Sequence, residues 1–181
     1  MKRRVFAGVL LGFLFISAGF ALPVTKIQYQ AADLGSGRWQ YTYSVTNISL
    51  TPVIEEFTIW FDFGQYDNLS IETPDPPSGG WDEVVIQPEP VLSDDGYYDA
   101  LSLDYGIGIG EMVSGFTVSF DWLSAGEPGS QLYEIIDPDT FETLDSGHTI
   151  PEPATLILLC LGGLILKRIN RIGLRVIKPR I

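Results

Sequence analysis

Five aspartates are the residues best suited to metal chemistry. They are Asp94, Asp95, Asp99, Asp137 and Asp139. The first three surround Gly96 and the last two flank Pro138, so we expect all five in loops, where carboxylate oxygens are the ligands that calcium prefers. Neither segment has the spacing of an EF-hand loop, and solvated acidic turns are the ordinary alternative. Calcium is therefore the one cofactor to test, with no diagnostic motif behind it.

Two tryptophans are candidates for contact with carbohydrate. Trp60 and Trp81 fall on or beside the polar faces of expected strands, where an indole ring can stack on a sugar. Packing of an edge strand, or against a second sheet, explains the same positions. Carbohydrate binding is thus a hypothesis that depends on where the fold places these two rings.

No set of residues predicts catalysis. The single histidine, His148, falls three residues before a Pro-Glu-Pro motif in an expected linker, where a Ser-His-Asp arrangement would lack a rigid scaffold. With 22 acidic residues in the region 22–149, a glycosidase-like carboxylate pair has no diagnostic spacing. The segment 106–110 lacks the GxGxxG spacing and leads into a strand, so we interpret it as a loop. We expect no catalytic residues and no enzymatic activity.

Charge is distributed unevenly along the 181 residues, whose formal net charge is −12. Residues 22–149 carry 22 acidic side chains against Lys26 and Arg38, whereas both ends of the chain are basic. So acidic a region repels polyphosphates, which excludes nucleic acid as its partner. The single cysteine, Cys160, lies outside it, so we expect neither a disulfide framework nor a thiolate metal site there.

The acidic region has the alternation typical of strands. In 39–46, 57–63 and 116–122 every second residue is aromatic or β-branched and most residues between are polar. Weaker strand candidates, separated by turn-forming residues, lie at 27–31, 68–71, 84–86, 97–103 and 132–136. We therefore predict one all-β domain over 22–149, an antiparallel β-sandwich of about seven to eight strands.

The first 21 residues have the order of a secretory signal peptide. Lys2, Arg3 and Arg4 precede an apolar run, and small residues follow it. Gly19 and Ala21 suit the −3 and −1 pockets of a signal peptidase, which predicts cleavage after Ala21. Cleavage after Gly19 and an uncleaved membrane anchor are the alternatives.

The C-terminal residues 150–181 have three parts: a motif at 151–153, an apolar stretch at 154–166 and a basic tail at 167–181. Thirteen apolar residues form roughly 20 Å of helix, which is shorter than the ~30 Å hydrocarbon core. Because Lys167 and Arg168 can snorkel and positive flanks stay cytoplasmic, we predict a weak transmembrane anchor. The two prolines of the motif predict an extended segment, accessible to a protease at the membrane surface.

This order resembles the PEP-CTERM sorting signal of Gram-negative bacteria that produce exopolysaccharide. The matching residues are Pro151, Glu152, Pro153, the apolar stretch with its glycines, Lys167 and Arg168. The resemblance implies that an exosortase, a membrane-embedded cysteine protease or transpeptidase, processes the chain near the motif. Residues 169–181 continue beyond the usual short basic end. This extension either contacts anionic lipids or has no function, and the sequence leaves both alternatives.

The acidic region also resembles, more loosely, PEP-CTERM proteins of unknown activity. The resemblance is in short sequence segments such as 41–47, 121–123 and 144–149. We expect an exported protein, held transiently in the inner membrane and ending at the cell surface or in the extracellular matrix. Its expected role is a non-enzymatic structural or binding component associated with exopolysaccharide. The alternatives are a calcium-dependent adhesin, a carbohydrate-binding module and an envelope hydrolase.

Overall fold

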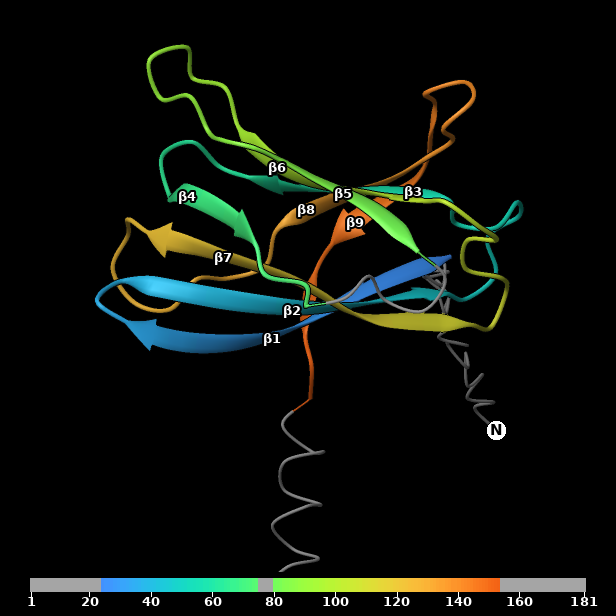
Figure 1. Cartoon of the computed structure of the whole chain (residues 1–181), viewed down its shortest axis with the longest axis horizontal. Helices are drawn as coiled ribbons and strands as arrows, with labels where there is room; N and C mark the ends of the chain where they lie inside the picture. The colour runs from blue at the N-terminus through green and yellow to red at the C-terminus, as the bar shows by residue number, and fades with distance from the viewer. Residues whose placement is uncertain (1–23, 75–79, 154–181) are drawn as a thin grey trace, which may run out of the picture.

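The computed structural model describes residues 24–74 and 80–153, which form two five-stranded sheets (Figure 1). Sheet 1 has the order β10-β1-β2-β7-β4, and sheet 2 has the order β5-β6-β3-β8-β9. The strands are β1 (Thr25–Gly35), β2 (Arg38–Asn47), β3 (Glu56–Phe61), β4 (Tyr66–Ile71), β5 (Trp81–Ile86), β6 (Gly96–Ser102), β7 (Met112–Trp122), β8 (Leu132–Ile136), β9 (Thr143–His148) and β10 (Ile150–Pro151).

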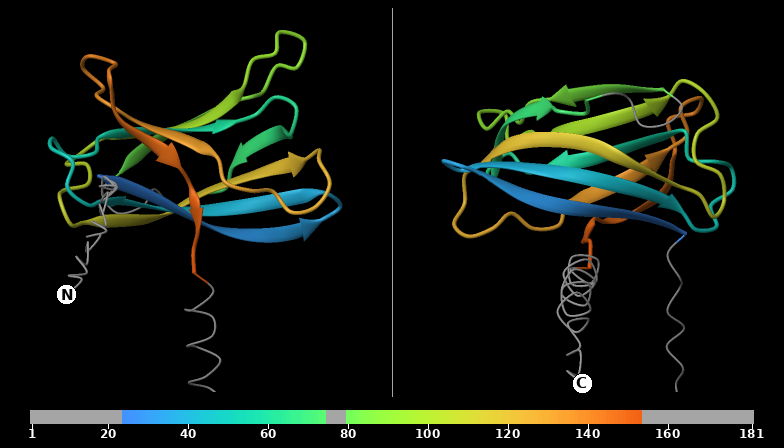
Figure 2. Two further views of the ribbon diagram at one scale, coloured as in Figure 1. Left: turned by 180° about the vertical axis from the view of Figure 1, so that it is seen from behind. Right: turned by 60° about the horizontal axis from the view of Figure 1, so that its bottom comes forward.

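The two sheets lie face to face, as the opposed views of Figures 1 and 2 show. Every strand pairing is antiparallel except that of β1 with β10, which is parallel. This arrangement confirms the predicted all-β, mainly antiparallel β-sandwich. The core between the sheets consists of the alternate residues that point inward from each strand.

The three aromatic strands predicted from alternation are β2, β3 and β7. Their inward side chains are fully buried: Tyr41, Tyr43, Val45, Phe57, Ile59, Phe61, Phe116, Val118 and Phe120. Phe63 lies beyond the end of β3 and is only half-buried, so the predicted face stops one position earlier. The two buried tyrosines keep hydrogen bonds for their hydroxyls, since Tyr41 donates to the Pro128 carbonyl at 2.5 Å and Tyr43 to Gln131 Oε1 at 3.0 Å.

The end of the acidic region is part of the fold, contrary to the expected linker around His148. His148 belongs to β9, which pairs with β8, and the chain then crosses from sheet 2 to sheet 1 and continues as β10 (Figure 2). Thr149, at the crossing, is fully buried, and its backbone N–H donates to the Gln131 carbonyl at 2.8 Å. The linker prediction is wrong because the pairing of β9 depends on backbone groups and needs no apolar alternation.

The Pro-Glu-Pro motif also begins inside the fold, because Pro151 pairs with Tyr29 of β1. The segment is extended, as expected, and both its prolines are exposed. Glu152 is half-buried against sheet 1, so the motif is less accessible than the sequence suggested.

Within 24–74 and 80–153, no helix is long and apolar enough to cross a membrane. The expected signal peptide with Gly19 and Ala21, the apolar stretch 154–166 and the basic tail with Lys167 and Arg168 lie outside the described residues.

Candidate functional site

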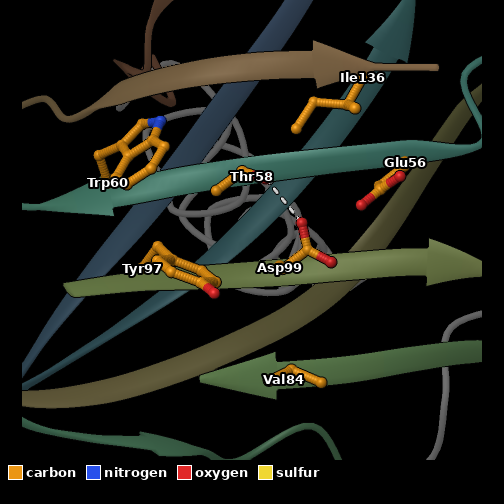
Figure 3. Close-up of a pocket in the computed structure, with 7 residues that line it drawn as sticks. All are labelled: Glu56, Thr58, Trp60, Val84, Tyr97, Asp99 and Ile136. Atoms are coloured by element: carbon orange, nitrogen blue, oxygen red, sulfur yellow. Dashed lines mark hydrogen bonds between the residues drawn. The ribbon is translucent and has the colours of Figure 1, made fainter. Parts of the chain in front are cut away.

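The outward face of sheet 2 brings together side chains from four strands. Strand register places Trp60 of β3 opposite Tyr97 of β6, and Thr58 opposite Asp99. Directly opposed residues share one face of a sheet. Together they form an open groove of about 370 Å³, called here the outer groove (Figure 3). Its lining residues are Glu56, Thr58, Trp60, Val84, Tyr97, Asp99 and Ile136.

One end of the outer groove is aromatic. The rings of Trp60 and Tyr97 meet edge to face, with centroids 5.4 Å apart and planes inclined by 61° (Figure 3). The indole N–H of Trp60 donates a 3.0 Å hydrogen bond to Glu134 Oε2 of β8. This bond and the tyrosine ring hold the indole in one orientation while part of it stays open to solvent.

The other end of the groove is acidic. Thr58 Oγ1 donates a 2.6 Å hydrogen bond to Asp99 Oδ1, which fixes this carboxylate beside the groove floor. Burial raises the pKa of Asp99 and outweighs the lowering by the Thr58 hydrogen bond, and the charge of Asp82 raises it further. Burial also raises the pKa of Glu56, with a second contribution from the charge of Asp99. Both carboxylates therefore lie where a negative charge is poorly compensated.

A second hollow, called here the end hollow, lies on the other side of Trp60. Its volume is about 250 Å³. Its lining residues are Trp60, Asp62, Gln65, Tyr66, Asp95, Ser130, Gln131, Leu132 and His148. Trp60 borders both hollows, so a ligand on the outer groove can continue past the indole toward His148.

The five aspartates proposed as calcium ligands lie in separate places. Asp99 is in strand β6, which agrees with the strand candidate 97–103 and corrects the expectation that this calcium candidate lies in a loop. Asp95 Oδ1 accepts a 3.0 Å bond from the Phe63 N–H, and Asp137 Oδ1 accepts a 2.9 Å bond from the Asp139 N–H within its own turn. The Asp94 carbonyl accepts a 2.9 Å bond from the Glu89 N–H. Among the described residues no three His, Cys, Asp or Glu side chains come together as a metal site, and calcium binding stays a prediction.

Trp81 is not a surface residue. It is 6% exposed, and its ring packs between Phe57 and Phe116 with centroid distances of 5.9 and 5.2 Å. The hypothesis that Trp81 stacks on a sugar is wrong, because the register of β5 turns this residue toward the core. The segment 106–110 lies in the loop between β6 and β7, as expected, where Ile107 pairs with Ile54.

Sequence reasoning singled out Trp60 and Asp99 but missed their neighbours Glu56, Tyr97 and Glu134. The alternation in 97–103 was the available signal, since it places Tyr97 and Asp99 on one face of the same strand. No comparable signal connects Glu56 or Glu134 to them, because their proximity comes from the pairing of β3 with β6 and β8.

Comparison with known proteins gives structural likenesses only. No family model and no curated protein sequence matches the chain. A family 3b carbohydrate-binding module from the biomass-sensing system of Clostridium clariflavum is 12% identical, with a TM-score of 0.44, over 74% of this chain and 99% of that one. A Clostridium thermocellum biomass-sensing module that resembles family 3 carbohydrate-binding modules is 14% identical, with a TM-score of 0.39, over 68% and 88%.

A third likeness is to a much larger enzyme. The GH20 exo-β-N-acetylglucosaminidase from Vibrio harveyi is 9% identical, with a TM-score of 0.34, and the match covers 72% of this chain but 18% of the enzyme. All three TM-scores lie below 0.5, so the fold assignment depends on the strand pairing of this chain rather than on these likenesses.

Proposed function

We propose that the chain is a non-enzymatic carbohydrate-binding protein whose ligand lies on the outer groove. The observation that carries this proposal is the oriented aromatic pair Trp60–Tyr97 beside the carboxylates of Glu56 and Asp99. A sugar ring offers an apolar C–H face and a rim of hydroxyl donors. An aromatic ring can stack on the C–H face, and carboxylate oxygens can accept hydrogen bonds from the hydroxyls. Binding sites for small molecules usually combine apolar surface with a few placed polar groups in this way.

The groove favours an extended glycan that crosses the strands. Ile86 lies opposite Tyr97, and Tyr97 lies opposite Trp60. Leu132 continues this apolar row on β8, because it borders the end hollow together with Trp60. Ile86 and Leu132 are 45% and 44% exposed. With roughly 4.8 Å between neighbouring strands, the row spans about 14 Å, which is more than one sugar ring needs.

A glycosidase is the second candidate, because Glu56 and Asp99 are paired carboxylates on a groove. Hydrolysis requires one carboxyl that stays protonated and another that stays ionised. Here burial raises the pKa of both groups, and neither has a nearby cation among the described residues that would hold it ionised as the base. We therefore favour binding without hydrolysis. The measurement is release of reducing sugar from each bound glycan; release that Glu56→Gln abolishes would establish the enzyme instead.

We also propose that the chain is exported by way of signal peptidase and sorted by an exosortase, so that the groove acts at the cell surface or in an exopolysaccharide matrix. The support for this proposal is the order of segments at the two ends of the sequence. Both end segments lie outside the described residues. Export agrees with a site for polymeric sugars, which are found outside the cell membrane.

The decisive variant is Trp60→Ala, measured by affinity electrophoresis and on a glycan array. Loss of the indole should weaken binding about tenfold or more, which corresponds to roughly 1.4 kcal/mol or more. The matched control is Tyr105→Ala, since the Tyr105 ring is 85% exposed and lies outside both hollows. Equal binding by wild type and Trp60→Ala, with unchanged melting temperatures, would contradict the proposal.

A further inference from the structure

We propose that the outer groove selects amine-bearing polysaccharides, with a sugar ammonium held between the carboxylates of Glu56 and Asp99 while another sugar of the same chain stacks on the ring of Trp60. This inference rests on the proposed function and names the class of glycan that the same site takes. It depends on three features of the groove: the placement of its carboxylates, the absence of lysine and arginine from its sheet, and the indole at the opposite end.

The two carboxylates are placed to share one cation. Glu56 lies opposite Leu101 and Asp99 lies opposite Thr58, so the two acids are diagonal neighbours on β3 and β6. Such neighbours are roughly 7–8 Å apart at the backbone, and Figure 3 shows both side chains on the same side of the groove. Within the described ranges no hydrogen bond reaches the Glu56 carboxylate, and the partner of Asp99 is the neutral hydroxyl of Thr58.

Sheet 2 contains no lysine or arginine to balance them, and its one histidine, His148, lines the end hollow rather than the outer groove. The region 22–149 contains Lys26 and Arg38 as its only lysine and arginine, and both belong to strands of sheet 1. Arg38 is already paired, since its guanidinium donates a 3.1 Å bond to Asp121 Oδ1. Asp82 on β5 and Glu134 on β8 add further negative charge on either side of the groove.

This charge pattern separates three classes of polysaccharide. The carboxylates of a uronate polymer would be repelled by those of Glu56 and Asp99, so the groove should bind this class weakly. A neutral polymer would stack on Trp60 without any electrostatic gain. An ammonium would form charge-assisted hydrogen bonds with Glu56 and Asp99 while another sugar of the same chain stacks on Trp60.

Burial is the main cause of the raised pKa values of Glu56 and Asp99, and no cation among the described residues lowers either pKa. A bound ammonium supplies that charge. If arginine or lysine of the same sheet already paired with these carboxylates, a ligand amine would add little electrostatic stabilisation.

The test compares matched oligosaccharides on the full-length protein in detergent. The probes are β-1,4-linked N-acetylglucosamine oligomers, the same oligomers after removal of their acetyl groups, and a uronate oligomer. Binding is measured by calorimetry at a mildly acidic pH where sugar amines are protonated, and at low and physiological salt. We expect the amine-bearing oligomer to bind about tenfold more tightly than its acetylated form, and the uronate to bind most weakly.

Variants separate the site from general attraction between an acidic protein and a polycation. Glu56→Gln and Asp99→Asn should abolish the preference for the amine while keeping binding to the acetylated oligomer. Glu127→Gln removes the same charge from an exposed loop position that lines neither hollow, and should keep the preference. Trp60→Ala should weaken binding of both oligomers.

Each outcome distinguishes the two proposals. Equal binding of the two glucosamine oligomers, still lost in Trp60→Ala, would overturn the inference and leave the proposed function standing. An equal effect of Glu127→Gln and Glu56→Gln, or equally tight binding of polylysine, would also overturn it, because charge alone would then explain the preference. Binding to none of the three glycans would overturn both proposals.

Discussion

Ser44 donates a 3.2 Å hydrogen bond from its hydroxyl to Oε1 of Glu152, which lies at the centre of the Pro-Glu-Pro motif. The bond crosses β1, since Ser44 is on β2 and Glu152 follows β10. Gln30 of β1 donates to the other carboxylate oxygen, and the backbone N–H of Glu152 donates to the Tyr29 carbonyl at 2.8 Å. The motif is thus attached to sheet 1 by the side chain of Glu152, which the sequence identified only as part of the motif.

Removal of the Glu152 carboxylate should loosen this attachment. In Glu152→Ala both side-chain hydrogen bonds are lost, and because the group is half exposed we expect a cost of roughly 1 kcal/mol and a melting temperature lower by a few degrees. Limited proteolysis should cut faster within 149–153. Glu127→Ala is the control for loss of a charge. Identical cleavage rates in wild type and Glu152→Ala would show that the carboxylate does not hold the segment.

The domain should be more stable when it includes β10. We expect a fragment of residues 22–153 to fold as a β protein without reductant and to melt several degrees above a fragment of residues 22–149. The shorter fragment loses the pairing of Ile150 and Pro151 with β1 and the contacts of Glu152. Circular dichroism and thermal melts make the comparison. A helical spectrum would contradict the fold, and equal melting temperatures would contradict the role of β10.

Asp99 should lower stability at neutral pH. Burial raises its pKa in the folded state, so the ionised form is disfavoured by folding. Stability relative to Asp99→Asn is therefore lowest above the folded pKa and recovers as the pH falls through that value toward the unfolded value of about 4. Asparagine keeps an oxygen that can accept from Thr58. We expect Asp99→Asn to melt higher than wild type at pH ~7 and equally at pH ~3.

Asp99→Ala is the matched control for that prediction. It removes the same charge but leaves the Thr58 hydroxyl, on a residue that is 3% exposed, without its partner. The unsatisfied hydroxyl should cost about 1–3 kcal/mol, so this variant should melt below Asp99→Asn. A melting temperature of Asp99→Asn below that of wild type at neutral pH would mean that burial does not dominate at this carboxyl.

The strands with alternating side chains could be predicted from the sequence. β9 and β10, which show no such alternation, could not. β2, β3 and β7 carry aromatic residues at every second position, so their inward faces could be identified directly. β9 reads Thr-Leu-Asp-Ser-Gly-His and shows no such alternation, yet it pairs along β8. The face of Trp81 depended on the register of β5, which no local pattern determines.

The candidate site was predictable only in part. Trp60 could be placed on an outward face because its neighbours Ile59 and Phe61 belong to the core. The closeness of Glu56, Asp99 and Glu134 results from the pairing of strands distant in the chain, and composition only indicated that such pairs would form somewhere. The excess of acidic residues was visible in the sequence, but the sequence did not show that sheet 2 would contain neither Lys26 nor Arg38.

The Pro-Glu-Pro motif should act in processing, and its attachment to sheet 1 allows two effects to be separated. Replacing Pro151, Glu152 and Pro153 with alanine should leave secretion intact but retain the full-length protein in the inner membrane of the native host. The double variant Gln30→Ala, Ser44→Ala keeps the motif but removes both donors to the Glu152 carboxylate.

If a protease must draw the motif away from sheet 1, the double variant should be processed faster than wild type, whereas the triple variant is not processed. Pulse-chase labelling with mass analysis of the released product follows both rates. Because the docked carboxylate is held by hydrogen bonds worth roughly 1 kcal/mol, the expected acceleration is at most about fivefold. Release of the triple variant at the wild-type mass and rate would remove the sorting proposal, while an unchanged rate in the double variant would show that undocking does not limit processing.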